Sequence, residues 1–342
     1  MGLLNFFTRE IAIDLGTANT LIMYNGKIVV NEPSIVAVDV RTGKVVAVGD
    51  KALFMHEKTN KMYETVRPLR DGVIADFTHA ENMIREFIKK IGNERKIFTA
   101  SHRMVICIPS GITEVEKRAV RDSAEQAGAK SVDLIAEPMA AAIGIGLDVE
   151  EPVGQMIVDI GGGTTEIAVI ALSGIVVEQS IRTAGDEFNN DIVEYLRQQH
   201  KLQIGEKTAE KIKIGVGAAI PELDKPPSNI ETKGRDLVQG IPKKISISYK
   251  EIAHALNKSI SVIEDAVLKV LEATPPELSS DIYENGIHLT GGGALLRGLA
   301  KRLSDRTKLP VHVAEDPLNA VVKGTGETLK DAKKYELVFD RT

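Results

Sequence analysis

An alternation of apolar and polar residues near the start of the chain predicts three short strands joined by tight turns. In residues 11–15 every second side chain is a large aliphatic one, which is typical of a strand. The small and polar residues 16–20 predict a turn, and the apolar residues 21–24 predict a returning strand. An Asn-Gly pair, which favours a hairpin turn, then leads into a third strand over 27–30.

The same arrangement is repeated in the second half of the chain. Apolar runs at 156–158, 166–172 and 175–177 predict strands, and the first two are separated by a glycine-rich turn. Both units contain the pattern Asp-Leu/Ile-Gly-x-x-x-Thr, which begins at Asp14 in the first unit and at Asp159 in the second. The chain therefore carries one strand–turn–strand–turn–strand unit in each half.

A third glycine cluster, Gly291 to Gly293, follows an apolar run at 286–290. Leucines spaced for one helical face predict a helix over 294–303. They are Leu295, Leu296, Leu299 and Leu303. Glycines where a strand meets a helix permit close approach of a flat base or sugar. Taken alone, the cluster is more typical of an ordinary strand-to-helix turn.

Turns of this composition suit the binding of a polyphosphate. Glycine and other small residues let backbone N–H groups approach an anion, and threonine hydroxyls and asparagine amides add hydrogen bonds. An aspartate at a strand end can face Mg²⁺ through water, because Mg²⁺ dehydrates reluctantly. A single such turn is more often an ordinary hairpin. Two of them, facing each other, would clamp a polyphosphate from both sides.

Composition narrows the remaining classes of function. A chain of 342 residues predicts two core-bearing domains. The net charge is −5 and no long run of Lys or Arg occurs, which argues against a nucleic-acid partner. The single cysteine, Cys107, lies in an apolar run and is interpreted as a small buried strand residue, so no intrachain disulfide or cysteine-rich zinc site is expected. P-loop, dinucleotide-binding, serine-hydrolase and zinc-protease motifs are missing from the sequence.

The three glycine-containing segments, in this order, resemble the nucleotide site of the actin, Hsp70 and sugar-kinase superfamily. A further superfamily signature, Glu-Pro-x-Ala-Ala-Ala, occupies 137–142, where Pro138 is expected at the first position of a helix. The similarity to bacterial actins of the MreB family is closer and runs almost end to end. The similar segments are 14–20, 31–34, 67–68, 71–77, 137–144, 159–166, 205–213, 289–297 and 314–317.

This resemblance implies an α/β, actin-like ATPase fold, with two RNase-H-like halves around a nucleotide cleft and a smaller subdomain on each half. The expected subdomains are IA at 1–32, 66–143 and 316–342, IB at 33–65, IIA at 144–181 and 243–315, and IIB at 182–242.

The resemblance also assigns roles to single residues. Asp14 and Asp159 would hold the water shell of Mg²⁺, and Glu137 would position the attacking water with help from Thr164. ATP would be held by two groups of residues, one from the facing turns and one from the base and ribose side. The first group is Thr17, Ala18, Asn19, Gly161, Gly162, Gly163 and Thr164. The second is Glu210, Lys211, Ile212, Lys213, Gly292, Gly293, Ala294 and Leu295. Without the resemblance, Glu210 and Lys213 would be a solvated pair one helical turn apart.

The implied function is that of an ATP-hydrolysing, filament-forming protein at the inner face of the cell membrane, which organises cell-wall elongation and maintains cell shape. Its implied partners are copies of itself, as paired protofilaments, together with membrane lipid and membrane-bound cell-wall elongation proteins. The alternatives are a plasmid-segregating or FtsA-like actin and an Hsp70-like nucleotide-binding module. An Hsp70 would need a substrate-binding region for which the chain has no room, and no signature of a sugar kinase's pocket or base is present.

Two apolar segments predict contact with a membrane surface. Leu3, Leu4, Phe6 and Phe7 would share one face of a helix, which suits an interfacial anchor. A frayed tail, or a segment that folds onto the domain, is an equal alternative. Ile97 and Phe98 stand in an otherwise polar loop, and MreB proteins insert such a loop into the membrane. No apolar run reaches the roughly 18 residues that a membrane span requires.

Overall fold

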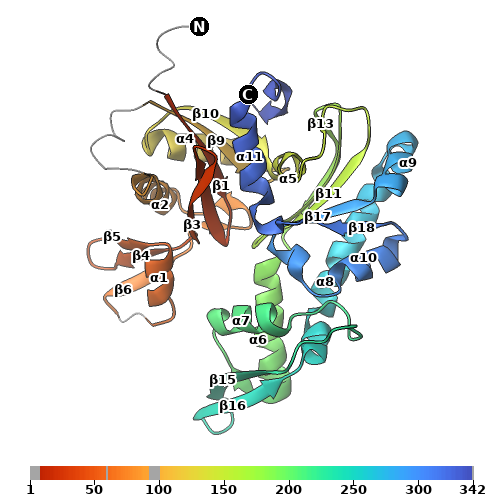
Figure 1. Ribbon diagram of the computed structural model, residues 1–342. Helices are drawn as coiled ribbons and strands as arrows, with labels where there is room; N and C mark the ends of the chain where they lie inside the picture. The colour runs from red at the N-terminus through yellow and green to blue at the C-terminus, as the bar shows by residue number, and fades with distance from the viewer. Residues whose placement is uncertain (1–7, 59–60, 92–100, 341–342) are drawn as a thin grey trace.

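A computed structural model describes residues 8–58, 61–91 and 101–340 of the chain. The first half is built on a six-stranded sheet in which β1 and β9, and β9 and β10, are parallel, whereas the other neighbours are antiparallel (Figure 1). Its strand order is β19 (Phe339–Asp340), β10 (Ala129–Ala136), β9 (Ser101–Ile108), β1 (Thr8–Leu15), β2 (Asn19–Tyr24) and β3 (Lys27–Pro33).

The second half repeats this architecture with a five-stranded sheet. Its order is β13 (Gly174–Ile181), β12 (Thr165–Ala171), β11 (Gln155–Ile160), β17 (Ile287–Thr290) and β18 (Val311–Val313). Here too an antiparallel meander, β11–β12–β13, is extended by parallel strands. The two strand–turn–strand–turn–strand units predicted from the sequence are therefore confirmed as β1–β3 and β11–β13, and the mixed α/β fold class is confirmed with them.

Two helices, α5 (Glu137–Gly144) and α11 (Ala320–Lys330), lie between the two sheets. Their axes approach so closely that a Cβ on Gly144 would lie 1.9 Å from the carbonyl oxygen of Ala320, and one on Gly324 would lie 1.7 Å from that of Ala140. Only glycine permits this contact. The helix expected to open at Pro138 begins one residue earlier, at Glu137, and Pro138 lies in its first turn.

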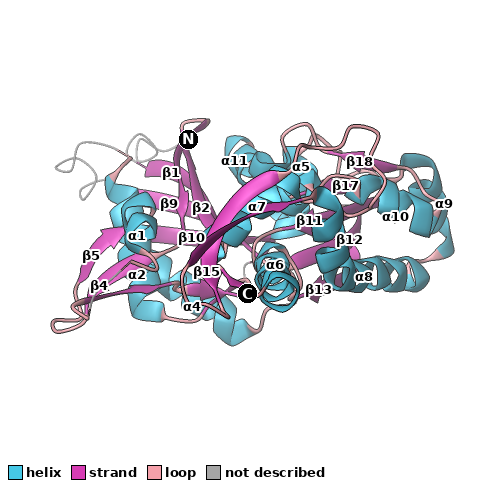
Figure 2. Cartoon of the chain, turned by 90° about the horizontal axis from the view of Figure 1, so that it is seen from below, coloured by secondary structure: helices cyan, strands magenta, loops and turns pink. Residues whose placement is uncertain are grey.

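Other helices cover the outer faces of the sheets (Figure 2). On the first half these are α2 (Phe77–Lys89) and α4 (Glu114–Gln126), and on the second half α8 (Tyr249–Ala273), α9 (Pro276–Asn285) and α10 (Leu299–Thr307). Short strands β7 (Leu69–Arg70) and β8 (Val73–Ile74) form a small hairpin, and single 3-10 turns occupy Gly292–Leu295, Pro317–Asn319 and Glu336–Val338. Within the described residues, no helix is long and apolar enough to cross a membrane.

Each half also carries a small three-stranded sheet. On the first half β5 (Val45–Val48), β4 (Val36–Asp39) and β6 (Tyr63–Val66) pack with α1 (Asp50–Met55). On the second, β14 (Leu202–Gln203), β15 (Ile230–Asp236) and β16 (Pro242–Ile247) accompany α6 (Gly185–His200) and α7 (Glu206–Val216). The strand β16 continues past residue 242, where subdomain IIB was expected to end, and the division into four subdomains stays a prediction.

The helix predicted over 294–303 is wrong in its first part. A 3-10 turn ends at Leu295, Leu296 is extended, and Gly298 adopts a left-handed conformation with φ 77° before α10 begins at Leu299. The leucine face is divided accordingly, since Leu299 and Leu303 are buried in the core and Leu295 is 55% exposed. The prediction for Cys107 is confirmed, because its side chain is buried in β9.

Candidate functional site

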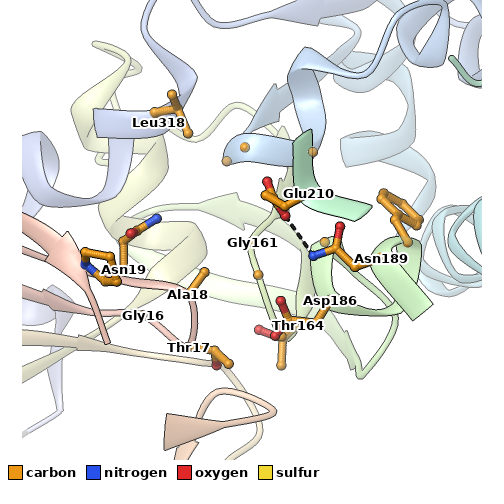
Figure 3. Close-up of a pocket in the computed structure, with 18 of the residues that line it drawn as sticks. Gly16, Thr17, Ala18, Asn19, Gly161, Thr164, Asp186, Asn189, Glu210 and Leu318 are labelled. Carbon is orange, nitrogen blue, oxygen red and sulfur yellow. Dashed lines mark hydrogen bonds between the residues drawn. The ribbon is translucent and has the colours of Figure 1, made fainter. Parts of the chain in front are cut away.

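A cavity of about 670 Å³ lies between the two halves and is lined by residues of both. Its volume is within the range of small-molecule sites. The turn after β1 contributes Gly16 to Asn19, and the turn after β11 contributes Gly161 to Thr164 (Figure 3). The two predicted turns therefore meet in space, although they lie far apart in the sequence.

The turns face each other so closely that the second one requires glycine. A Cβ on Gly162 would lie 2.5 Å from the Cβ of Ala18, and one on Gly163 would lie 2.7 Å from Oγ1 of Thr17. The Thr17 hydroxyl oxygen also accepts a hydrogen bond of 2.9 Å from the backbone N–H of Gly72. This arrangement leaves a narrow cradle of backbone, which suits a polyphosphate that bridges the halves.

Three carboxyl groups line the cavity, those of Asp159 and Glu137, which are buried, and that of Asp14, which is partly buried. Burial raises the pKa of Asp14 to about 6. Burial, with the charges of Asp14 and Glu166, raises the pKa of Asp159 to about 7. The pKa of Glu137 is raised well above its usual range by burial first and then by the charges of Glu166, Asp14 and Asp159. So much unbalanced negative charge favours a bound cation.

The donor set fits Mg²⁺ held through water. Oδ1 of Asp159 is buried and has no hydrogen-bond partner within the described residues, and Asp14 faces it from the other half. Among these residues, no group of three or more His, Cys, Asp or Glu side chains is arranged to hold a metal ion. Mg²⁺ commonly binds through one or two carboxylates, several waters and phosphate oxygens rather than in an all-protein cage.

The side of the cavity expected to hold the ribose carries a hydrogen-bonded cluster on α6 and α7. Oε2 of Glu210 accepts a hydrogen bond of 2.7 Å from Nδ2 of Asn189 (Figure 3). The same oxygen accepts a hydrogen bond of 2.7 Å from Nζ of Lys213. Nζ of Lys213 donates a second hydrogen bond, 2.9 Å long, to the carbonyl oxygen of Gly185. The carboxylate of Glu210 is thereby fixed in place, with its other oxygen left for a ligand hydroxyl.

Apolar side chains surround the neighbouring part of the cavity. Ile214, Leu295 and Leu318 line it and remain 67%, 55% and 56% exposed. Gly291, at φ 77°, brings the backbone so close to β11 that a Cβ there would lie 2.4 Å from the carbonyl oxygen of Ile160. Exposed apolar groups next to a bare glycine backbone suit a flat aromatic base.

Most of the residues predicted to bind nucleotide or Mg²⁺ or to position water line this cavity, but three of them do not. Lys211 is exposed and Ile212 is buried in the core, because on α7 the cavity face follows the helical period through Glu206, Glu210 and Lys213. Ala294 is also buried in the core, because within the 3-10 turn Gly292–Leu295 its side chain packs inward whereas Leu295 lines the cavity. The six apolar residues predicted to contact a membrane lie outside the described residues. They are Leu3, Leu4, Phe6, Phe7, Ile97 and Phe98.

Other lining residues were missed in the sequence. Asp186 follows Gly185 at the start of α6, and burial raises its pKa to about 6. An Ala-Gly-Asp sequence between a strand and a helix was the available signal for it. His56, Arg67 and Glu206 close the mouth of the cavity from opposite halves, and no local pattern marks them.

Comparison with known proteins agrees with this geometry. A family model described as MreB/Mbl protein matches residues 8–337. The chain is 49% identical over 329 residues to the cell shape-determining protein Mbl of Bacillus subtilis (strain 168), with 96% of this chain and 98% of Mbl covered. It is 48% identical over 329 residues to the cell shape-determining protein MreB of Escherichia coli (strain K12), with 95% and 94% covered.

Solved structures give the same result. The crystal structure of MreB5 of Spiroplasma citri bound to ADP superimposes with a TM-score of 0.90 at 40% identity and covers 96% of this chain and 98% of that one. A second MreB5 structure, bound to AMPPNP, matches equally well, with a TM-score of 0.90 at 40% identity over 96% of this chain and 97% of that one. With its facing turns and actin-like fold, the chain belongs to the MreB/Mbl family.

Proposed function

We propose that this protein is a Mg²⁺-dependent ATPase that assembles into filaments at the inner face of the cell membrane and organises cell-wall elongation. The observation that carries the nucleotide part is the meeting of the two glycine turns between Asp14 and Asp159. Nucleotide binding is also supported by the MreB5 structures, whose ligands are ADP and AMPPNP. The role in cell shape is supported by the relatives that are named for it.

In the proposed complex the two turns hold the phosphates of ATP. Backbone N–H groups of 16–19 and 161–164, with the hydroxyl of Thr164, face the β- and γ-phosphates from opposite halves. Asp14 and Asp159 orient the water shell of Mg²⁺, and the bound ion supplies positive charge that offsets the charge of the phosphates. Glu210 and Lys213 face the ribose, and Gly292, Gly293 and Leu295 face the adenine.

Glu137 is the residue we propose for positioning the attacking water. Its carboxylate stands in the first turn of α5, is buried and lines the cavity, as Thr164 does. A carboxylate there can accept a hydrogen bond from a water in line with the γ-phosphate. Phosphoryl transfer depends mainly on positioning and charge stabilisation, so the orientation of this water is what the residue contributes.

Filament assembly and membrane contact complete the proposal. Copies of the chain would form paired protofilaments, and Leu3, Leu4, Phe6, Phe7, Ile97 and Phe98 would contact lipid. One subunit would bind weakly, but a filament presents many copies and binds through avidity. Membrane-bound cell-wall elongation proteins would then be recruited along the filament. The alternative of a plasmid-segregating or FtsA-like actin is set aside, because the chain belongs to the MreB/Mbl family.

Electron microscopy and phosphate release with Mg-ATP test the proposal together. The protein is incubated with Mg-ATP, Mg-ADP or no nucleotide, with and without vesicles of anionic lipid. We expect filaments and phosphate release with Mg-ATP, and filaments lying on the vesicles. Absence of polymer under all conditions, from protein that binds ATP, would refute the filament function and favour a monomeric ATPase.

A further inference from the structure

Glu166 is a buried carboxylate that the proposed mechanism does not use. Its relative exposure is 0%, and it lies on β12 outside the lining of the cavity. Oε2 accepts hydrogen bonds from the backbone N–H of Ser110, at 3.2 Å, and from Oγ of the same serine, at 2.7 Å. Oε1 accepts a hydrogen bond of 2.7 Å from Oγ of Ser180. Within the described residues, no Lys, Arg or His forms an ion pair with it.

These hydrogen bonds join the two halves of the molecule. Ser110 follows β9 in the six-stranded sheet of the first half, whereas Glu166 and Ser180 are register partners on β12 and β13 of the second. Glu166 is also the register partner of Asp159 across β11 and β12. The carboxylate therefore ties the first half to the strand that leads directly out of the glycine turn 161–164.

Pro109, the residue before Ser110, lies close to Gly72, which contacts both glycine-containing turns. A Cβ on Gly72 would lie 2.6 Å from Cγ of Pro109 and 3.1 Å from Cγ2 of Thr164, and the N–H of Gly72 donates to Thr17. The residue before Ser110 thus packs against the segment that contacts both phosphate turns. A displacement of Ser110 relative to Glu166 would change how Thr17 and Thr164 face each other.

Glu166 also stands close to the residue proposed to position water. After burial, its charge is the largest influence that raises the pKa of Glu137, ahead of those of Asp14 and Asp159. Burying a carboxylate without a cation is unfavourable unless its oxygens are hydrogen-bonded. Two of the three donors belong to the other half. The favourable arrangement of Glu166 is therefore available only while the two halves keep the relative position seen here.

From this geometry we infer that Glu166 is a positioning residue for ATP hydrolysis, which holds the phosphate turns in the relative position at which Glu137 faces the γ-phosphate. The inference rests on the proposed ATPase function. Glu166 itself lies outside the lining of the cavity. It acts through the hydrogen bonds of Ser110 and Ser180, so its loss affects turnover more than the affinity for ATP.

The test combines hydrogen exchange with kinetics on the full chain. The variants are Glu166→Gln, Ser110→Ala and Ser180→Ala, and the control is Glu178→Gln, an exposed carboxylate on the adjacent strand β13. Exchange at the Ser110 amide is read in nucleotide-free protein by mass spectrometry of short peptides. ATP affinity and single-turnover hydrolysis are measured on the same samples.

We expect exchange at the Ser110 amide to be about tenfold faster in Glu166→Gln than in the wild type or in Glu178→Gln. The glutamine keeps only one, neutral acceptor oxygen, so the charge-assisted hydrogen bond from Ser110 is weakened. Turnover of Glu166→Gln should fall about tenfold or more, whereas its affinity for ATP should change by less than about threefold. Ser110→Ala combined with Glu166→Gln should be no worse than Glu166→Gln alone, since residues that share one interaction are not additive. Ser180→Ala, which leaves the bonds to Ser110 in place, should show a smaller loss.

Three outcomes would overturn the inference. An unchanged Ser110 amide in Glu166→Gln would show that the bond does not restrain the halves in solution. Faster exchange with normal turnover would show a restraint without a role in positioning. Equal losses of affinity and turnover would indicate general damage. If Glu166→Gln does not fold, Ser110→Ala, which removes the hydroxyl bond between the halves, supplies the comparison of turnover with affinity. Failure of the wild type to hydrolyse ATP would refute the proposed function instead, while the exchange result would still report on the restraint.

Discussion

Arg67 and Glu206 connect the two halves across the mouth of the cavity, with Nη2 of Arg67 2.6 Å from Oε1 of Glu206. His56 adds Nε2 at 3.5 Å from the other oxygen of Glu206. The backbone N–H of Glu206, at the start of α7, donates a hydrogen bond of 3.0 Å to Oε1 of Glu57. Glu57 adopts a φ of 61°, which is uncommon outside glycine and places its carboxylate at the helix N-terminus.

The first prediction is that these contacts slow the release of nucleotide. Arg67→Ala or Glu206→Gln should accelerate dissociation of a fluorescent ATP analogue. The side chain of Glu206 is 37% exposed, so the pair is worth about 0.2–1 kcal/mol, and the expected acceleration is ~1.5- to 5-fold. Stopped-flow displacement with excess ATP measures the rate.

A matched control is Lys301→Ala, which removes the exposed pair of Lys301 with Asp305 on α10. This pair lies away from the lining of the cavity, so dissociation should be unchanged. If Arg67→Ala also released nucleotide at the wild-type rate, the mouth contacts would not govern release.

The second prediction concerns the metal. Asp14→Asn and Asp159→Asn each remove one carboxylate from the proposed Mg²⁺ shell, and the size of the side chain stays the same. Each should weaken binding of Mg-ATP by about tenfold or more and leave binding of ATP in EDTA nearly unchanged. Isothermal titration with and without Mg²⁺ gives both affinities. Equal losses under the two conditions would contradict the assignment.

The third prediction follows from the raised pKa values of the same carboxyl groups. With a pKa of about 6 for Asp14 and about 7 for Asp159, both are partly protonated in slightly acidic solution. Mg²⁺ requires the ionised forms, so the gain in ATP affinity on adding Mg²⁺ should rise with pH from about 5.5 to 7.5. A gain that is independent of pH over this range would argue against a role of these carboxylates in holding Mg²⁺.

The same shifts determine how stability depends on pH when no ligand is present. Both pKa values lie above the unfolded value of 3.8, so between these values the folded protein binds more protons than the unfolded chain. The stability contributed by protonated Asp14 and Asp159 is complete below about pH 4 and is lost as pH rises through about 6 to 7. Thermal unfolding of nucleotide-free protein should show this decline, and Mg-ATP should reduce it.

Much of the fold can be predicted from the sequence because its signals are local. The strands β1–β3 and β11–β13 follow from alternation of apolar residues and from turns at Asn25-Gly26 and Ser173-Gly174. The helix over 294–303 fails for a local reason as well. Gly298 adopts a left-handed conformation, so no helix can run through it, and a leucine pattern alone does not reveal that conformation.

The cross-half contacts of the site are not predictable from local patterns. Arg67 and Glu206 are 139 residues apart, and Ser110 and Glu166 are 56 apart, so neither pair leaves a signature in any short segment. The role of Glu210 was inferred from a family resemblance. What fixes its carboxylate, the amide of Asn189, became visible only once α6 and α7 lay side by side.

The fourth prediction concerns the two apolar segments outside the described residues. Changing Phe6 and Phe7 to serine, together with Ile97 and Phe98, should abolish co-sedimentation of filaments with anionic liposomes and leave ATP affinity intact. Each buried side chain contributes ~1.5–3 kcal/mol, and ordering each residue costs ~1–2 kcal/mol. The net affinity of one subunit is therefore small. Unchanged sedimentation of the fourfold variant, with filaments visible by microscopy, would refute the membrane contact.

The last prediction separates two roles for Glu137. A glutamate in the first turn of a helix stabilises the helix dipole by ~0.3–1 kcal/mol, and its replacement would lower thermal stability slightly without changing turnover. Replacement of a water-positioning carboxylate would instead lower turnover and leave thermal stability largely unchanged. Burial of Glu137 among Asp14, Asp159 and Glu166 favours the second role, because a dipole-stabilising glutamate gains nothing from three neighbouring negative charges.

Glu137→Ala and Glu137→Gln should each reduce hydrolysis by ~10²–10⁴-fold, within the range of general-base effects. ATP binding should be largely retained, since the side chain would face water rather than nucleotide. Filaments assembled with ATP should therefore persist longer, because the γ-phosphate is retained. Phosphate release and light scattering recorded on the same sample give turnover and polymer lifetime together. Glu137→Gln keeps the size of the side chain and removes only its charge, so near-normal phosphate release by well-folded Glu137→Gln filaments would exclude the carboxylate as the group that orients water.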